Sequence, residues 1–281
     1  MPSLSRRHFL TTAAAGAAVS LVRGPRARAA DDATPDRYIL GLQSYSLRNF
    51  PVDKAIEQTR ELGLHAIEFF GGHFSLDSSP EQIAAMKAKL SGPGIHPWGH
   101  GVNGFTKDHE ANRRIFEFAK QAGVRNLSAD PTEDSFDSLD RLVAEYKIRI
   151  AIHNHGPGAR YNKINDVLEA IKGRHKLIGA CADLGHYIRS GEDPVKAIHL
   201  FEGRLYGVHL KDFDEPKGNA RGVILGKGQL DVVGVFKALD QVKFPADGSL
   251  SIEYEEKPEN PMDDLRQCVT ISREAMKKAA G

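Results

Sequence analysis

The sequence predicts a single (β/α)₈ barrel, because eight short apolar runs alternate with longer helical patterns at an even spacing. No linker rich in proline or serine divides the chain, so residues 37–281 are taken as one domain. The stretch from Ile39 to Lys278 allows about 30 residues per strand–helix unit, and eight units in about 250 residues are typical of a closed barrel. The predicted strands are residues 39–45, 66–69, 95–98, 126–129, 149–153, 178–183, 206–209 and 249–253.

Between the predicted strands, apolar residues recur at the 3.6-residue period of an amphipathic helix. Three such stripes are Val52, Ile56, Thr59 and Leu62; Ile83, Met86 and Leu90; and Leu265, Val269 and Met276. A doubly wound open sheet is the alternative fold, but its dinucleotide-binding form places a Gly-x-Gly-x-x-Gly turn after the first strand. Residues 41–45 read Gly-Leu-Gln-Ser-Tyr, which is not that turn, so the barrel is preferred.

The first 29 residues differ in composition from the rest and predict a cleavable signal peptide of the twin-arginine type. Arg6 and Arg7 precede an apolar stretch that ends near Val22, and residues 27–29 read Ala-Arg-Ala, as at a cleavage site. The apolar stretch is too short to span a membrane, so no stable anchor is expected after cleavage. We therefore expect a periplasmic or secreted protein that the twin-arginine machinery exports in its folded state.

The charge balance and the cysteine content restrict the class of partner. Five of the 38 basic residues lie in the predicted leader, which leaves 33 basic and 37 acidic residues and a formal charge of −4. This balance argues against nucleic acid as a partner. The sequence contains two cysteines, Cys181 and Cys268, and two cysteines do not make a disulfide framework. Whether they are free is left open.

Four residues with metal-binding side chains end the last four predicted strands: His153, Asp183, His209 and Glu253. In a barrel, the carboxyl ends of the strands surround one mouth. One divalent ion there would satisfy two imidazoles and two carboxylates that would otherwise be destabilising when buried. Singly, each residue would more often be a hydrogen-bonded structural residue, but four in succession predict a site for one ion. The ligand set suits Mn, Zn, Co or Fe, with Mg as an alternative.

Short motifs around these positions make the chain resemble the xylose isomerase-like TIM barrels, also described as the sugar phosphate isomerase/epimerase or AP endonuclease family 2 group. The resemblance runs from about Ile39 to the C-terminus. The motifs that carry it are residues 183–186 (Asp-Leu-Gly-His), 191–194 (Gly-Glu-Asp-Pro), 208–212 (Val-His-Leu-Lys-Asp), 226–228 (Gly-Lys-Gly) and 252–254 (Ile-Glu-Tyr). The resemblance implies a barrel whose metal ligands end strands five to eight, at the same four positions.

Position 153 departs from the pattern of the family. The family usually has a Glu-Asn-His run there, whereas residues 153–155 of this chain read His-Asn-His. With an imidazole in place of a carboxylate, the ion would keep two compensating negative charges and act as a stronger Lewis acid. Related ketose epimerases use the glutamates of strands five and eight as paired acid and base. This chain retains only Glu253, so two-base epimerisation is disfavoured.

Other residues near the strand ends are candidates for catalysis beside Glu253. By the resemblance, His186 would bind substrate hydroxyls or act as an acid or base, with a structural loop histidine as the alternative. Lys211 could stabilise an enolate oxygen or form a surface ion pair with Asp212. Glu68 could act as a base or bind a sugar hydroxyl, or it could line the barrel paired with a neighbouring donor.

The remaining candidates concern substrate binding and packing. His155 is expected either to contact the substrate or to support the ligands, and His186 and Lys211 are also expected at the substrate. Trp98 and His100, together with Tyr45 and Phe70, could form an apolar platform for a sugar ring, although core packing is commoner for such rings. Cys181 is interpreted as packing inside the barrel, and the glycines of residues 226–228 as a flexible connection.

The leading hypothesis is a divalent-metal-dependent enzyme similar to sugar isomerases and epimerases, which enolises a ketose or keto-glycoside through an enediolate. The alternative is a lyase or hydratase of 3-keto-glycosides, which export and the replaced glutamate favour. A phosphodiesterase is a further alternative, but the resembling endonucleases use three zinc ions and more ligands. A non-catalytic sugar-binding protein is the last. The expected partners are thus a small carbohydrate and the export machinery, with a second copy of the chain left open.

Overall fold

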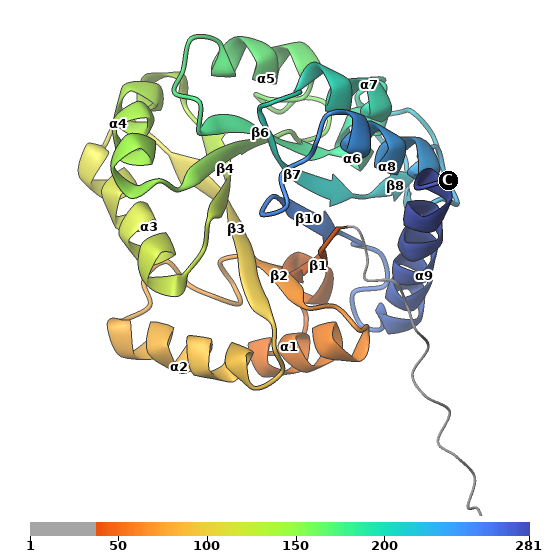
Figure 1. Ribbon diagram of the computed structural model, residues 1–281, viewed down its shortest axis with the longest axis horizontal. Coiled ribbons are helices and arrows are strands. Elements are labelled where there is room, and N and C mark those ends of the chain that lie inside the picture. Colours follow the sequence, from red (N-terminus) through yellow and green to blue (C-terminus); the bar gives the residue numbers. More distant parts are fainter. Residues whose placement is uncertain (1–37) are drawn as a thin grey trace, which may run out of the picture. The chain divides into compact units, whose positions relative to one another are not determined.

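The computed structural model describes residues 38–281, which form a closed barrel of eight parallel strands (Figure 1). The predicted signal peptide, residues 1–29, lies outside the described residues. The strands follow one another around the barrel in the order β1-β10-β7-β6-β5-β4-β3-β2. The barrel is closed because β1 pairs with β2 as well as with β10. They are β1 (Leu40–Gln43), β2 (Ala66–Phe69), β3 (His96–Phe105), β4 (Asn126–Pro131), β5 (Arg149–His153), β6 (Ile178–Asp183), β7 (Leu205–Leu210) and β10 (Ser249–Ile252). The predicted fold class is confirmed.

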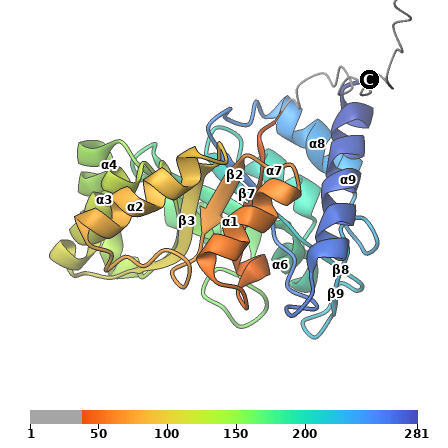
Figure 2. The same ribbon diagram turned by 90° about the horizontal axis from the view of Figure 1, so that it is seen from below.

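Helices surround the barrel and cover the outer faces of its strands (Figures 1 and 2). The predicted apolar stripes face inward, since Ile56 of the first helix and Leu265 and Val269 of the last are buried. The helices are α1 (Val52–Glu61), α2 (Pro80–Ser91), α3 (His109–Ala122), α4 (Phe136–Tyr146), α5 (Ile164–Ile171), α6 (Leu184–Arg189), α7 (Pro194–Leu200), α8 (Val232–Gln241) and α9 (Met262–Ala279), with 3-10 turns at Ser44–Leu47 and Glu133–Ser135. Within residues 38–281, none of these helices combines the length and hydropathy needed to cross a membrane.

The third strand is longer than the sequence predicted. The predicted strand ended at residue 98, whereas β3 continues to Phe105. Its pairing with β4 is irregular between His100 and Asn103, so the bulge interrupts the pattern of alternating side chains that marks a regular strand. The carboxyl end of β3, where a functional residue would lie, is therefore several residues further along the chain.

A short antiparallel hairpin, which the sequence did not predict, follows β7. It consists of β8 (Asp212–Phe213) and β9 (Gly222–Val223) and lies beside α6 (Figure 2). Each strand has only two residues, too few for a hydrophobic period to be visible in the sequence. The hairpin extends one rim of the barrel.

Polar side chains as well as apolar ones fill the interior of the barrel. The fully buried carboxylate of Glu68 lies beside Gly99, where a Cβ atom would be only 3.1 Å from Glu68 Cγ. A glycine on β3 thus makes room for a charged side chain from β2. Cys181 is also inside, with its Sγ 3.8 Å from Ser128 Oγ, and it packs as the sequence predicted. Cys181 and Cys268 are both free and buried.

Candidate metal centre

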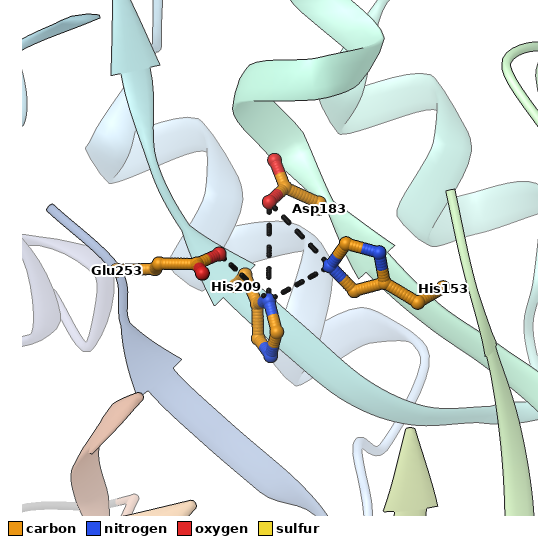
Figure 3. Close-up of side chains that lie close together, drawn as sticks. All are labelled: His153, Asp183, His209 and Glu253. Carbon is orange, nitrogen blue, oxygen red and sulfur yellow. Dashed lines mark hydrogen bonds and ion pairs between the residues drawn. The ribbon is translucent and has the colours of Figure 1, made fainter. Parts of the chain in front are cut away.

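The structure brings together all four residues predicted as metal ligands, at the carboxyl ends of the last four barrel strands (Figure 3). One ligand atom from each residue lies within 4.8 Å of the others. His209 Nδ1 is 3.0 Å from His153 Nε2, 3.0 Å from Glu253 Oε2 and 3.8 Å from Asp183 Oδ2. All four side chains are buried, so their polar atoms need partners that water cannot supply.

Hydrogen bonds fix the backbone around this cluster. His153 and Asp183 are the last residues of β5 and β6, and Asn154 joins the two strand ends. Its amide donates to Asp183 O at 3.0 Å, and its Oδ1 accepts from Asp183 N at 2.8 Å. Asp183 also caps α6, because its Oδ1 accepts a hydrogen bond from His186 N at 2.8 Å. Asn154 is a site residue that the sequence analysis missed, although its position between two candidate histidines was a signal.

The electrostatics of the cluster fit a divalent cation. Burial opposes ionisation of Asp183, yet its neighbours His186 and Lys211 hold the pKa of that carboxyl well below its ordinary value. Burial likewise opposes ionisation of Glu253, but Lys211 and His209 lower its pKa to about 2. Asp183 Oδ2 is buried and accepts no hydrogen bond from residues 38–281. Two ionised carboxylates and two imidazoles could therefore hold one divalent ion such as Zn, Mn, Co or Fe.

Lys211 is buried beside the cluster. Its Nζ lies 3.1 Å from Glu253 Oε2 and 3.3 Å from Asp183 Oδ2, and it also contacts Glu255. Burial favours the neutral amine, but these carboxylates raise the pKa of Lys211 above the ordinary lysine value. The alternative of a surface ion pair with Asp212 is wrong, because the lysine pairs with carboxylates of the cluster. Glu255, which the sequence analysis did not single out, is its third partner.

Asp212 instead organises the loop that contains residues 226–228. Its carboxylate accepts backbone hydrogen bonds from Gly226, Gly228, Gln229 and Leu230 at 2.9–3.0 Å. A Cβ atom on residue 228 would lie 2.2 Å from a main-chain oxygen, so this close approach requires glycine. The interpretation of the loop as a flexible connection is therefore wrong, since four main-chain donors converge on one carboxylate.

Glu68, predicted as a catalytic residue, lies beneath the cluster and inside the barrel. It is fully buried, and its Oε2 accepts a hydrogen bond from His209 Nε2 at 3.0 Å. The hydroxyls that also donate to its carboxylate belong to Ser128, Ser249 and Ser251. Burial opposes ionisation, but His209 and the hydroxyls lower the pKa of Glu68 to about 2. The prediction of a substrate contact is wrong because donors surround the carboxylate, and the alternative of a paired, barrel-lining residue fits.

Glu68→Gln is expected to weaken binding of a divalent ion by about 10- to 100-fold, the usual effect of losing a group that orients a ligating histidine. The carboxylate holds a proton on His209 Nε2 and so directs Nδ1 toward the other three ligands. Titration calorimetry of Zn²⁺ with the metal-free protein measures the affinity. Ser251→Ala, which removes one donor to Glu68 and keeps its bond to His209, is the control. Equal affinities of Glu68→Gln and wild type would contradict the orienting role.

A cavity of about 370 Å³ opens over the cluster. His155 and His186, both predicted at the substrate, line it together with Lys211 and Glu253. Burial lowers the pKa of His155 to about 4 and that of His186 to about 3, so both rings are neutral at pH 7. The remaining wall includes the aromatic rings of Tyr45 and Phe70, whose centroids are 5.3 Å apart.

Trp98 and His100 do not reach this cavity. Trp98 Nε1 donates to the carbonyl of Gly248, just before β10, which places the ring at the amino end of the barrel. His100 is buried and its Nε2 lies 2.8 Å from the carbonyl oxygen of Phe74. The predicted substrate contacts of both residues are wrong because β3 extends beyond them. Val102, further along that strand, is the residue that lines the cavity.

Eight parallel strands, a buried cluster of four side chains that could hold a metal ion and a cavity above it define a (β/α)₈ barrel with a candidate metal site. Residues 56–273 match the model of the family described as xylose isomerase-like TIM barrel. The chain therefore belongs to this family, and the resemblance found in its sequence is confirmed.

Individual relatives carry the names of enzymes. The chain is 30% identical over 145 residues to an inosose dehydratase of Clostridium botulinum, an alignment that covers 45% of this chain and 48% of that protein. The match thus spans about half the length of the dehydratase.

Solved structures share the fold at lower identity. The 3-keto-D-glucoside 4-epimerase of E. coli is 17% identical, with a TM-score of 0.67 over 85% of this chain and 100% of the epimerase. The IOLI protein, whose structure contains a zinc atom, is also 17% identical, with a TM-score of 0.69 over 85% of this chain and 98% of that protein. The barrel is therefore a fold that a zinc-binding protein and a carbohydrate epimerase share.

Proposed function

We propose that this protein is an exported, divalent-metal-dependent enzyme that removes a carbon-bound proton next to a carbonyl group of a carbohydrate. The observation that carries the proposal is the cavity over the four-residue cluster, which His153 and Glu253 of that cluster line. When bound, the ion would supply a Lewis acid that polarises the carbonyl oxygen. The names of the dehydratase and the epimerase support a carbohydrate as the substrate.

Side chains that line the cavity can serve the other steps of proton removal, namely charge stabilisation, proton transfer and substrate binding. The Lys211 ammonium lies between the cluster and the cavity, where it can stabilise the negative charge that develops on an enediolate oxygen. His186 is neutral, and its Nδ1 has no hydrogen-bond partner among residues 38–281. Because its ring also lines the cavity, we propose that His186 accepts the proton, while His155 would donate a hydrogen bond to a substrate hydroxyl.

The distribution of carboxylates in the cavity favours elimination or addition of water over epimerisation. Glu253 and Glu255 both follow β10, whereas His153 and His155 line the β5 side. Two-base inversion needs a proton acceptor on each face of one carbon, and His153 directs its Nε2 at the other ligands. We therefore favour a lyase, dehydratase or hydratase, with a sugar isomerase or epimerase as the second candidate.

A phosphodiesterase and a non-catalytic sugar-binding protein receive less support. Among residues 38–281, the four-residue cluster is the one group of three or more side chains with ligand geometry, too few for the three zinc ions of the resembling endonucleases. The acidic balance of the chain after leader removal also disfavours DNA. A non-catalytic protein would bind a carbohydrate without turning it over, so a measured reaction excludes it.

Incubation in heavy water with Zn²⁺- or Mn²⁺-loaded protein tests the proposed reaction. Free ketoses and 3-keto-glycosides are followed by NMR for deuterium at the carbon next to the carbonyl. A lyase or dehydratase is expected to give an unsaturated product with loss of the aglycone or of water, whereas an epimerase gives inversion with exchange. His186→Ala should slow the exchange by about 100-fold or more, as expected for loss of a general base.

Controls separate the proposed chemistry from exchange without the enzyme. Exchange should stop when a chelator removes the ion and in His153→Ala, which lacks one ligand. The variant Trp98→Phe, altered at the opposite end of the barrel, should keep the wild-type rate. Exchange that persists at full rate in His153→Ala without metal would exclude the mechanism.

A further inference from the structure

A second cavity adjoins the first at the metal cluster. It has a volume of about 260 Å³ and shares four lining residues with the first, namely His186, Lys211, Glu253 and Glu255. We call the cavity toward Tyr45 and Phe70 the first lobe, and the one under the β8–β9 hairpin the second lobe. Figure 2 shows that hairpin beside α6 at the rim of the barrel. The reactive groups therefore lie where the two lobes meet.

The second lobe presents polar groups that have no partner in the protein. The half-buried Glu256 carboxylate and the exposed Asn219 amide both line the lobe, and neither makes a hydrogen bond or ion pair with another described residue. Such groups can accept hydrogen bonds from hydroxyl groups of a ligand. The lobe is thus suited to a ligand with several hydroxyls.

Charges in the second lobe disfavour an anionic ligand. Arg189 donates from Nε and one Nη to the carbonyl of Gly218, at 3.1 and 2.6 Å. Lys211 is neutralised by three carboxylates. The carboxylates of Glu255 and Glu256 would repel a phosphate or a carboxylate entering the lobe. The lobe therefore fits a neutral, hydroxylated group.

From this geometry we infer that the substrate is a neutral glycoside, with its reacting sugar in the first lobe and a hydroxylated aglycone of sugar size in the second. The inference rests on the proposed function, because it takes the shared residues as the site of reaction. A glycosidic bond would cross the junction where Lys211 and Glu253 lie. A free monosaccharide would leave the second lobe unused. A phosphorylated sugar would be repelled from it.

Two keto-glycosides with the same reacting ring test the role of the second lobe: methyl 3-keto-α-D-glucoside and 3-keto-trehalose. The wild type is expected to favour 3-keto-trehalose in kcat/KM by about tenfold or more, equivalent to one or two added hydrogen bonds. Asn219→Trp, a bulky change at an exposed position of the lobe, should remove this preference by lowering kcat/KM for 3-keto-trehalose. Glu256→Gln should reduce the preference in part.

A matched control and a binding measurement make the outcome unambiguous. Glu215→Gln changes an exposed carboxylate on the same hairpin loop that pairs with Lys217 and lines neither lobe; it should keep the full preference. Equal kcat/KM for the two substrates in the wild type, or a preference that survives Asn219→Trp, would overturn the inference. If neither substrate reacts, the proposed reaction fails, and saturation-transfer NMR with sucrose, a neutral disaccharide whose two rings give separate signals, then decides. Contacts of the protein with both rings of the disaccharide would support the inference of two lobes. Contacts with one ring or with neither would overturn it.

Discussion

Addition of Zn²⁺ to the metal-free protein is expected to raise its free energy of unfolding by about 2.7 kcal/mol when the free ion is at about 100 times its dissociation constant. The folded chain holds two buried, ionised carboxylates and two imidazoles within 4.8 Å of one another. The unfolded chain has no such arrangement, so binding stabilises the folded state alone. Calorimetric unfolding after chelation, with and without added ion, measures the effect.

The variant Asp183→Asn should lose this stabilisation almost completely. It removes one of the two ligand charges, while an asparagine oxygen can still accept the hydrogen bond from His186 N that caps α6. The matched control is Asp193→Asn, the same change at the cap of α7, where Asp193 accepts from Val195 N and Lys196 N at 2.9 and 3.0 Å. The control should respond to Zn²⁺ like the wild type. A full response of Asp183→Asn would show that the ion binds elsewhere.

The sequence predicted the barrel and the metal cluster because both depend on local patterns that barrel geometry brings together. Each of His153, Asp183, His209 and Glu253 lies at or next to the end of a strand whose hydrophobic run is legible. In parallel strands of a closed barrel, these ends share one mouth whatever the loop conformations are. The membership of the cluster therefore followed from the sequence without knowledge of any distance.

Strand limits were the weaker part of the prediction, and they account for the errors at Trp98 and His100. The proline and glycines of residues 97–101 suggest the end of a strand, yet β3 continues through them with an irregular register. Moving the strand end to Phe105 places Trp98 at the amino end and Val102 in the cavity. A boundary error of a few residues thus assigned side chains to the wrong end of the barrel.

Contacts between distant segments could not be predicted from local patterns. Glu68 and His209 are separated by 141 positions, and their hydrogen bond exists only because the barrel closes. The glycine that makes room for Glu68 comes from another strand. Asp212 likewise reveals its function only when the 226–230 segment folds back on it. In the sequence, a structural carboxylate such as Glu68 looks like a catalytic one, because both kinds of residue follow the same apolar strand pattern.

Lys211→Met is expected to tighten the binding of a divalent ion by about tenfold or more, because it removes a positive charge close to two ligands. In the wild type, the ammonium lies 3.3 Å from Asp183 Oδ2 and 3.1 Å from Glu253 Oε2, so an incoming ion must be accommodated next to it. The metal-free variant should be less stable by about 3 kcal/mol, since the carboxylates lose their buried partner. Titration calorimetry and unfolding of the chelated protein measure the two effects.

Turnover of the same variant should change in the opposite direction to its metal affinity. If Lys211 stabilises the charge of an enediolate, kcat should fall by about 100-fold or more while the ion binds more tightly. Lys217→Met, which removes an exposed lysine paired with Glu215, should change neither quantity. Weaker metal binding in Lys211→Met would mean that the lysine organises the ligands, and unchanged turnover would exclude it from the reaction. Tighter binding combined with lost activity is the result that a lysine acting on the substrate, and not on the ligands, should give.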